Sequence, residues 1–268
     1  MTWQRRSGLA LLAVLLVLAV AGPVVAPDWQ SMSDPLTRAL LPPSSAHWLG
    51  TDQLARDVFA RLAYGARISL TVATIAVAVA ALIGTTIGLA AGTAHGWAER
   101  ALQRLINLGL ALPRIIVLLV VLAAVGLLSA PVLGVILGAT GWPAVARLVR
   151  GETLRLRQAP FVAAAHALGA PPARIVWREI LPGTLPAVLV ATTLGLADAI
   201  LLEAGLSFIG VGVRPPIPSW GGMILDAREQ LASAPWLMIA PCLALGLATS
   251  AATLLGEALR RSLQPDTR

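Results

Sequence analysis

Residues 161–182 read FVAAAHALGAPPARIVWREILP and carry Arg174, Arg178 and Glu179 between two long apolar stretches. Polar loops exposed to lipid do not occur in the hydrocarbon of a bilayer, because their backbone hydrogen bonds would stay unmade there. We therefore expect this segment to form a polar helical hairpin that lies in water and contacts a partner.

The rest of the chain is strongly apolar. Of the 268 residues, 57% are hydrophobic and 12% are charged, against about 25% charged residues in soluble domains. The mean hydropathy is +0.80. Several uncharged runs approach the roughly 20 residues that cross a bilayer core as a helix. The sequence therefore predicts an all-α polytopic membrane protein in contact with lipid.

Hydropathy predicts six transmembrane helices. The first run could instead be a signal peptide, but its length favours a retained span. Arg114 lies within the third span, close enough to one end for its guanidinium to reach the interface. The predicted spans lie near residues 8–26, 68–92, 105–127, 132–149, 185–206 and 236–258.

The arginines are distributed unevenly between the two sides of these spans. With the N-terminus in the cytoplasm, thirteen arginines fall inside and six outside, with Arg114 left out of the count. Because cytoplasmic loops are enriched in basic residues, we expect both termini and the hairpin in the cytoplasm.

Two of the predicted outer segments are longer than simple turns. Residues 27–67 contain DQLARDVFARL, an amphipathic stretch that predicts a helix lying at the membrane interface. Residues 207–235 contain RPPIPSWGGM, whose prolines and paired glycines predict an irregular loop. Trp48, Trp220 and Trp236 lie near the outer boundary, where indoles are expected to anchor among the lipid headgroups.

Composition also excludes several functions. The net charge of +7 comes from scattered arginines rather than one basic domain, so nucleic-acid binding is not expected. The chain has no lysine, and a P-loop nucleotide site requires one. Cys242 is the single cysteine, and His47, His95 and His166 fall in three separate segments, so no metal site is expected.

The hairpin itself has a recognisable internal plan. Residues 155–168 are expected to form one helix, Gly169 to turn the chain, and residues 172–181 to form a second helix that Pro182 ends. Aliphatic residues beside arginines on the second helix suit docking in a partner's groove. An amphipathic connector resting on the membrane surface would show the same pattern.

Two further sets of residues lie within predicted spans. Gly84, Gly88 and Gly92 repeat every four residues and open one helix face to close contact, either within the chain or between two chains. Asp198 and Glu203 lie in or near the fifth span and could line or gate a solute pathway. Each could instead be tied to a neighbouring helix or the outer interface. Their spacing places them roughly 140° apart, so they are not expected to share an ion.

The segment at 161–182 resembles the EAA loop of ABC importer permeases, and the resemblance extends over nearly the whole chain. It is similar to the second permease of the dipeptide, oligopeptide and nickel family. The matching stretches are HWLGTDQLARDVFARLAYGARISL (47–70), GWPAVARLVRGETLRLR (141–157), the hairpin, AILLEAGLSFIGVGVRPPIPSWGGM (199–223) and SAPW (233–236).

The resemblance implies a type I ABC importer permease fold in a bacterial inner membrane. It implies a permease core at 68–262 with a coupling loop at 151–184, preceded by a helix and outer segment at 1–67 and followed by a tail at 263–268. The implied coupling residues are Ala163, Ala164, Ala165, Gly169, Arg174, Arg178, Glu179 and Pro182.

The resemblance also implies the chain's partners. They are a homologous second permease, two ABC ATPase subunits and an extracytoplasmic solute-binding protein. The chain would be a non-catalytic subunit without a cofactor of its own, with ATP and Mg²⁺ used by the ATPases. The solute would be a peptide or a related small molecule, including nickel or its chelates.

The sequence departs from the family pattern at three positions. Ala163 replaces the usual Glu of the loop, Glu179 replaces a usual His, and Ala55 replaces a usual Gly. The alternative function is an autonomous secondary transporter or channel, which predicts coupling-ion carboxylates on facing broken helices. An intramembrane hydrolase ranks third, since Ser207 has no histidine at its predicted depth.

Overall fold

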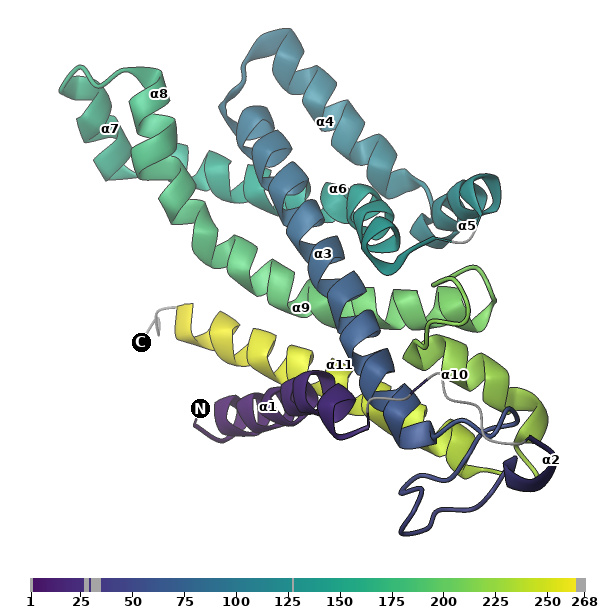
Figure 1. Cartoon of the computed structure of the whole chain (residues 1–268). Coiled ribbons are helices and arrows are strands. Elements are labelled where there is room, and N and C mark those ends of the chain that lie inside the picture. Colours follow the sequence, from purple (N-terminus) through teal and green to yellow (C-terminus); the bar gives the residue numbers. More distant parts are fainter. Residues whose placement is uncertain (1, 27–28, 30–34, 127, 264–268) are drawn as a thin grey trace.

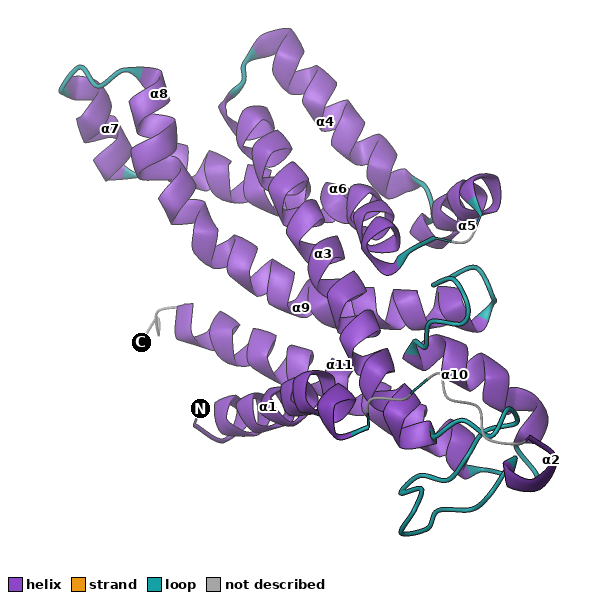
Figure 2. Ribbon diagram, viewed as in Figure 1, coloured by secondary structure: helices purple, strands orange, loops and turns teal. Residues whose placement is uncertain are grey.

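The computed structural model describes residues 2–26, 29, 35–126 and 128–263. Figures 1 and 2 show helices joined by loops, with no strand among these residues. The helices are α1 (Thr2–Val25), α2 (Pro35–Arg38), α3 (Val58–Thr93), α4 (Gly96–Ala111), α5 (Arg114–Val125), α6 (Ala130–Arg157), α7 (Pro160–Ala167), α8 (Pro172–Ile175), α9 (Leu181–Phe208), α10 (Trp220–Ala227) and α11 (Trp236–Leu263), with a π-helical turn at Val176–Ile180 and a 3₁₀ turn at Arg228–Gln230.

The described residues include four helices long and apolar enough to cross a membrane, or five if the bent pair α4 and α5 forms one span. The four are α3, α6, α11 and the continuous helix Pro172–Phe208. Within α1, residues Arg6–Gly22 form a shorter apolar helix, and α1 lies along α11 (Figure 1). The multi-pass helical class is confirmed, whereas the number of six spans stays a prediction.

The seam between α3 and α6 forms the centre of the fold. A Cβ atom added to Gly88 would lie 2.7 Å from the carbonyl oxygen of Ala146, and one added to Gly138 would lie 2.6 Å from that of Ala76. Additions at Gly84 and Gly92 would likewise strike side chains of α6. Small residues let membrane helices approach closely where lipid gives no hydrophobic drive for association. The three α3 glycines therefore contact α6 of the same chain.

The expected third span at 105–127 is not one helix. The chain bends by 83° between α4 and α5. Pro113 has no N–H to donate, and its ring forces the preceding Leu112 into an extended conformation. The bend makes Arg114 the first residue of α5, where its guanidinium donates to the Leu137 carbonyl of α6.

The predicted helix at 155–168 is interrupted. Within this stretch, α6 ends at Arg157 and α7 begins at Pro160. A break of two residues, Gln158–Ala159, separates them. Proline is tolerated in a first helical turn but clashes with the carbonyl four residues earlier if the helix continues through it. The prediction of one helix rested on the alanines of this stretch and took no account of Pro160.

Pro182 does not end a helix, contrary to the prediction. The chain stays helical from Pro172 to Phe208 through the π turn at Val176–Ile180. The Leu181 N–H donates to Val176, five residues earlier, as in a π turn. A wider turn before a proline leaves room for the proline ring and accommodates the missing N–H donor. The hairpin is therefore joined to α9 without a break.

The expected interfacial helix in DQLARDVFARL is also wrong. Its first half forms a turn, and α3 begins at Val58 with Asp57 as its N-cap, whose carboxylate accepts from Ala60 N at 2.9 Å. Ala55 adopts a φ of 56° in this turn. That left-handed conformation suits glycine, the residue that the family pattern has there.

A buried ion cluster closes the same turn. Asp52 accepts from Arg56 Nε at 2.7 Å and from Arg61 Nη1 at 2.5 Å, while Arg61 Nη2 donates to Asp226 at 3.0 Å. The two arginines are only 8% and 5% exposed, although they were counted as outside topology signals. Without them the outside count falls from six to four, so the direction of the asymmetry is unchanged.

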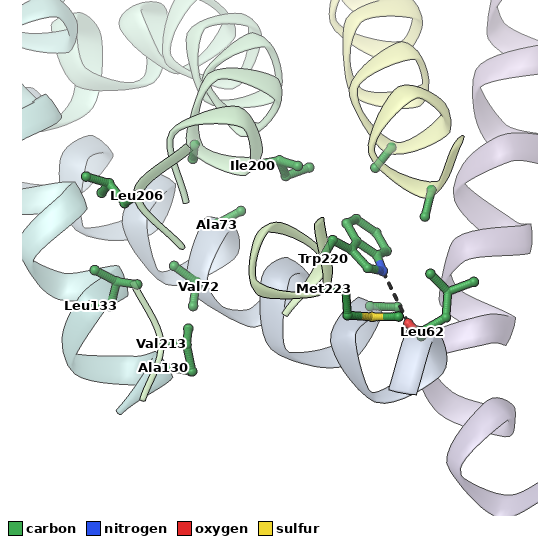
Figure 3. Packing of buried hydrophobic residues seen from close by; sticks show 14 of the residues in the cluster. Leu62, Val72, Ala73, Ala130, Leu133, Ile200, Leu206, Val213, Trp220 and Met223 are labelled. Carbon is green, nitrogen blue, oxygen red and sulfur yellow. Dashed lines mark hydrogen bonds between the residues drawn. The ribbon is translucent and has the colours of Figure 1, made fainter. Parts of the chain in front are cut away.

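The segment at 207–235, predicted to lie outside, is more ordered than expected, because α10 begins directly at Trp220. The Ser219 side chain caps this helix, and Gly221 lies directly against the Ala204 backbone, where no side chain would fit. Trp220 is fully buried rather than anchored at the interface, and its indole N–H donates to the Leu62 carbonyl at 3.2 Å (Figure 3). This end of the molecule, which we call the outer end after its predicted orientation, is thus a packed layer over α3 and α9.

Candidate coupling hairpin and membrane cavity

The hairpin formed by α7 and α8 folds back on the ends of α6 and α9. Val162 and Ile175 point into a buried cluster that includes Leu156 and Ile180. Figure 1 shows α7 and α8 at one tip of the molecule. The apolar side of the hairpin thus fixes its position on the bundle, and its other side stays open.

The turn between α7 and α8 is closed by backbone bonds. Gly169 has a φ of 77° and donates to His166 at 3.0 Å, while Ala170 donates to Ala165 at 3.1 Å. This pattern is the Schellman end of a helix, in which glycine takes the left-handed position without a Cβ penalty. A rigid turn therefore presents the hairpin tip.

The open side of the hairpin combines apolar and basic groups. Leu168 is 88% exposed and Trp177 is 65% exposed. Arg174 and Arg178 are exposed, and neither forms an ion pair with any described residue. Among the other residues that the resemblance singles out, Ala163, Ala164, Gly169 and Pro182 are exposed, and Ala165 and Glu179 are half-buried.

A second feature is a cavity of about 210 Å³ between α3, α5, α6 and α9. Arg114 and Asp198 both line it, together with small or aliphatic residues such as Ala76 and Val145. Arg114 donates to the Leu137 carbonyl at 2.7 Å. Asp198 is exposed and has no hydrogen bond or ion pair with a described residue.

The second predicted carboxylate, Glu203, is placed quite differently. It is fully buried. It accepts from the Ser69 hydroxyl at 2.8 Å and from the Ser207 hydroxyl at 2.7 Å. Ser69 Oγ also accepts from Trp220 N at 3.3 Å. Glu203 therefore joins α3, α9 and α10 beneath the outer layer, and the structure does not bring it together with Asp198.

The histidines and the cysteine do not assemble into a metal centre in the described part of the chain, where no group of three potential ligands occurs. His47 Nδ1 lies 2.8 Å from Asp57, and His95 Nε2 lies 2.6 Å from an Arg157 nitrogen. Both histidines thus hold loops at helix ends.

Sequence reasoning missed two groupings. The charge pattern from Asp52 to Arg61 could have indicated an ion cluster, since Arg56 follows Asp52 at helical spacing. No sequence signal joins Arg114 to Asp198, because they lie on different helices that only the tertiary fold brings to one cavity.

Several long apolar helices and an exposed hairpin between two of them define a polytopic helical membrane protein. The family model described as "Binding-protein-dependent transport system inner membrane component" matches residues 84–268. The chain belongs to this family of ABC importer permeases.

Individual relatives agree over nearly the whole chain. The dipeptide transport system permease protein DppC of Bacillus subtilis is 38% identical over 98% of this chain and 82% of its own length. The probable peptide ABC transporter permease protein y4tQ of Sinorhizobium fredii is 44% identical over 94% of this chain and 85% of its own. The glutathione transport system permease protein GsiD of Pectobacterium atrosepticum is 43% identical over 83% of this chain and 74% of its own.

Family membership implies ATPase, binding-protein and second-permease partners. It gives no support to an autonomous secondary transporter or channel. The chain is a permease subunit of an ATP-binding-cassette importer.

Proposed function

We propose that this chain forms half of a solute pathway through a bacterial inner membrane and pairs with a homologous second permease. Two ATPase subunits, which hold ATP and Mg²⁺, would drive it through the segment at 151–184. The observation that carries the proposal is a rigid hairpin tip with exposed apolar side chains and unpaired arginines.

The hairpin suits docking to a protein better than resting on lipid. Its rigid Gly169 turn fixes the tip in one shape, and Val162 and Ile175 already face the bundle. Leu168 and Trp177 are thereby free to enter a groove of the ATPase. Arg174 and Arg178 would lie at the rim of that groove. Because the chain is helical from Pro172 through Phe208, movement of the docked hairpin would be carried directly into α9.

The solute pathway is proposed along the side of α9 that carries Asp198. A charged side chain in the lipid core costs about 2.5–3.5 kcal/mol, so such residues face water or protein. Only 17% of the apolar stretch of Pro172–Phe208 is buried within the chain, against 39% for α3, α6 and α11. The second permease would cover this uncovered helix and close the path around Asp198.

The topology that fits this arrangement has six spans, both termini in the cytoplasm and the hairpin beside the ATPases. Arginine asymmetry supports it. Peptides are the first solute class we propose, because relatives named for dipeptide and peptide transport match nearly the full chain. Glutathione, and nickel or its chelates, form the related group.

The assembly can be tested by purifying the tagged chain from its host in mild detergent and identifying the co-purifying proteins by mass spectrometry. An ABC ATPase and a second, homologous permease are expected. A lone protein that transports solute without them would overturn the proposal.

Docking can be tested at the hairpin turn with Gly169→Trp. Nothing lies within 4 Å of a Cβ added there, so the indole would point outward into the docking surface. ATPase co-purification is expected to be lost while membrane insertion persists. The matched control is Gly169→Asn, because asparagine tolerates the left-handed conformation and is small. Equal ATPase recovery with both variants would contradict docking at this turn.

A further inference from the structure

The cavity between α3, α5, α6 and α9 contains two opposite charges that attract each other across it without direct contact. Arg114 and Asp198 both line it, yet no ion pair joins them. The remaining lining is apolar or small, apart from Thr192. It lies near the middle of α3, α6 and α9, and Arg114 reaches it from the first residue of α5.

Arg114 is held in place with bonding capacity to spare. Its Nη2 donates to the Leu137 carbonyl at 2.7 Å, and its Nε lies 3.4 Å from Thr140 Oγ1. A Cβ added to Gly141 would lie 2.8 Å from Nη2, so glycine leaves the room that the guanidinium occupies. A guanidinium presents a fork of N–H donors that matches a carboxylate, and the donors of Nη1 remain for a solute.

Asp198 supplies the complementary group from the opposite helix. It is exposed and forms no hydrogen bond or ion pair with a described residue, and Arg114 acts on it only through the electric field across the cavity. A carboxylate at this depth is costly unless water, protein or a cation meets it. A solute that carries both an ammonium and a carboxylate would satisfy the two side chains together.

We propose that this cavity is a transient binding site for short zwitterionic solutes in the transport pathway. Asp198 receives the ammonium group, Arg114 receives the carboxylate, and the aliphatic walls contact the atoms between. The inference rests on the proposed function and adds a substrate class and two specificity residues to it.

The size of the cavity limits how much of a solute it can enclose. Its volume of about 210 Å³ is below the roughly 300 Å³ at which ordinary ligand pockets begin. Such a space holds a short main chain with two charged ends. Side chains of the solute would extend toward the uncovered side of α9, where the second permease would complete the site. A site in a pathway must also release its solute, which a half-site of this kind allows.

The test uses the full transporter in proteoliposomes, with its own partner permease, ATPases and binding protein. The probe is an equimolar mixture of dipeptides with free termini, and accumulated peptides are quantified by mass spectrometry. The variants are Arg114→Gln and Asp198→Asn, with Arg114→Lys and Asp198→Glu as charge-retaining versions. Arg104→Gln is the matched control, since Arg104 is exposed on α4 and outside the cavity.

Each neutral variant is expected to lower the uptake rate about tenfold, the size of one lost charge-assisted hydrogen bond. The charge-retaining variants should stay within about threefold of wild type, because a charge still faces the same end of the solute. Arg104→Gln should match wild type. Co-elution of all subunits on size exclusion verifies assembly of every variant.

Three outcomes would count against the inference. Uptake at the wild-type rate by both neutral variants would overturn it while leaving the permease function intact. Equal loss in Arg114→Lys and Arg114→Gln, together with uptake at the wild-type rate by Asp198→Asn, would assign the arginine to helix packing alone. A wild-type transporter that accumulates none of the dipeptides would overturn peptides as the solute, and the inference with them.

Discussion

The buried charged residues at one end of the molecule are paired, whereas the hairpin arginines at the other end are not. At the outer end, Asp52, Arg61 and Asp226 are joined in a cluster, and Glu203 accepts from two serine hydroxyls. At the hairpin, Arg174 and Arg178 have no ion-pair partner among the described residues, and Leu168 is almost fully exposed.

This difference separates residues that stabilise the fold from residues that are available to bind another subunit. A buried ion that loses its partner is strongly destabilising, so the outer cluster must stay closed for the fold to persist. Exposed charges and single apolar side chains contribute little to stability by themselves. Changes at the outer end should therefore affect folding, and changes at the hairpin should affect assembly.

The largest effect is expected from Asp52→Ala, which should lower stability by about 3–5 kcal/mol. The change leaves Arg56 and Arg61 buried without their main carboxylate partner. The measurement is the thermal unfolding midpoint of the detergent-solubilised transporter.

Glu229→Ala is the control for this change, because Glu229 is exposed at the same end and forms only a surface pair. It should change stability by less than about 0.5 kcal/mol. If both variants unfold at the same temperature as wild type, the outer cluster does not hold the fold.

An intermediate effect, on assembly alone, is expected from Leu168→Ser. Stability should stay within about 0.5 kcal/mol of wild type, since the side chain is exposed. Binding of the ATPase should weaken by about thirtyfold, because burying a leucine contributes about 2 kcal/mol. Titration of purified ATPase onto the permease pair measures this.

Leu263→Ser is a matched control for Leu168→Ser, as an exposed leucine at the end of α11. It should leave ATPase binding unchanged. A stability loss without a binding loss in Leu168→Ser would reverse the contrast between the two ends.

The smallest effect is expected from Ala55→Gly, a gain of about 0.5 kcal/mol. A non-glycine residue in the left-handed region costs about 1–2 kcal/mol, and the greater freedom of glycine in the unfolded chain offsets about 0.5–1 kcal/mol of that. The unfolding midpoint should rise slightly. A drop would mean that the Ala55 methyl, which is buried, contributes more through packing than the strain removes.

The long apolar helices could be predicted closely because hydropathy depends on local composition. The helices α3, α6 and α11 contain the predicted second, fourth and sixth spans and extend past them at one end or both. Three of the errors in helix limits occur at prolines, whose effect depends on the turn before them. Pro113 and Pro160 begin new helices, while Pro182 continues one after a π turn. Sequence alone does not show whether a proline will begin a new helix or continue an existing one.

The candidate sites divide in the same way. The hairpin is contiguous in sequence, so its residues and its glycine turn could be predicted together. The cavity required α5 to bend away from α4, which brought Arg114 to Asp198 from a distant helix. Helical periodicity predicted that Asp198 and Glu203 lie on different faces of the helix. It did not predict which of the two is buried.

The sequence by itself determined the helical membrane class, the polar hairpin and the family pattern, because each depends on neighbouring residues and local periodicity. Only the tertiary structure decided that Arg56 and Arg61 are buried partners rather than surface charges. It also decided that Glu203 is enclosed and that Asp198 faces a cavity with Arg114. The physical reason is that burial and charge pairing depend on which distant helices meet, and that depends on the glycine seam, the α4–α5 bend and the π turn.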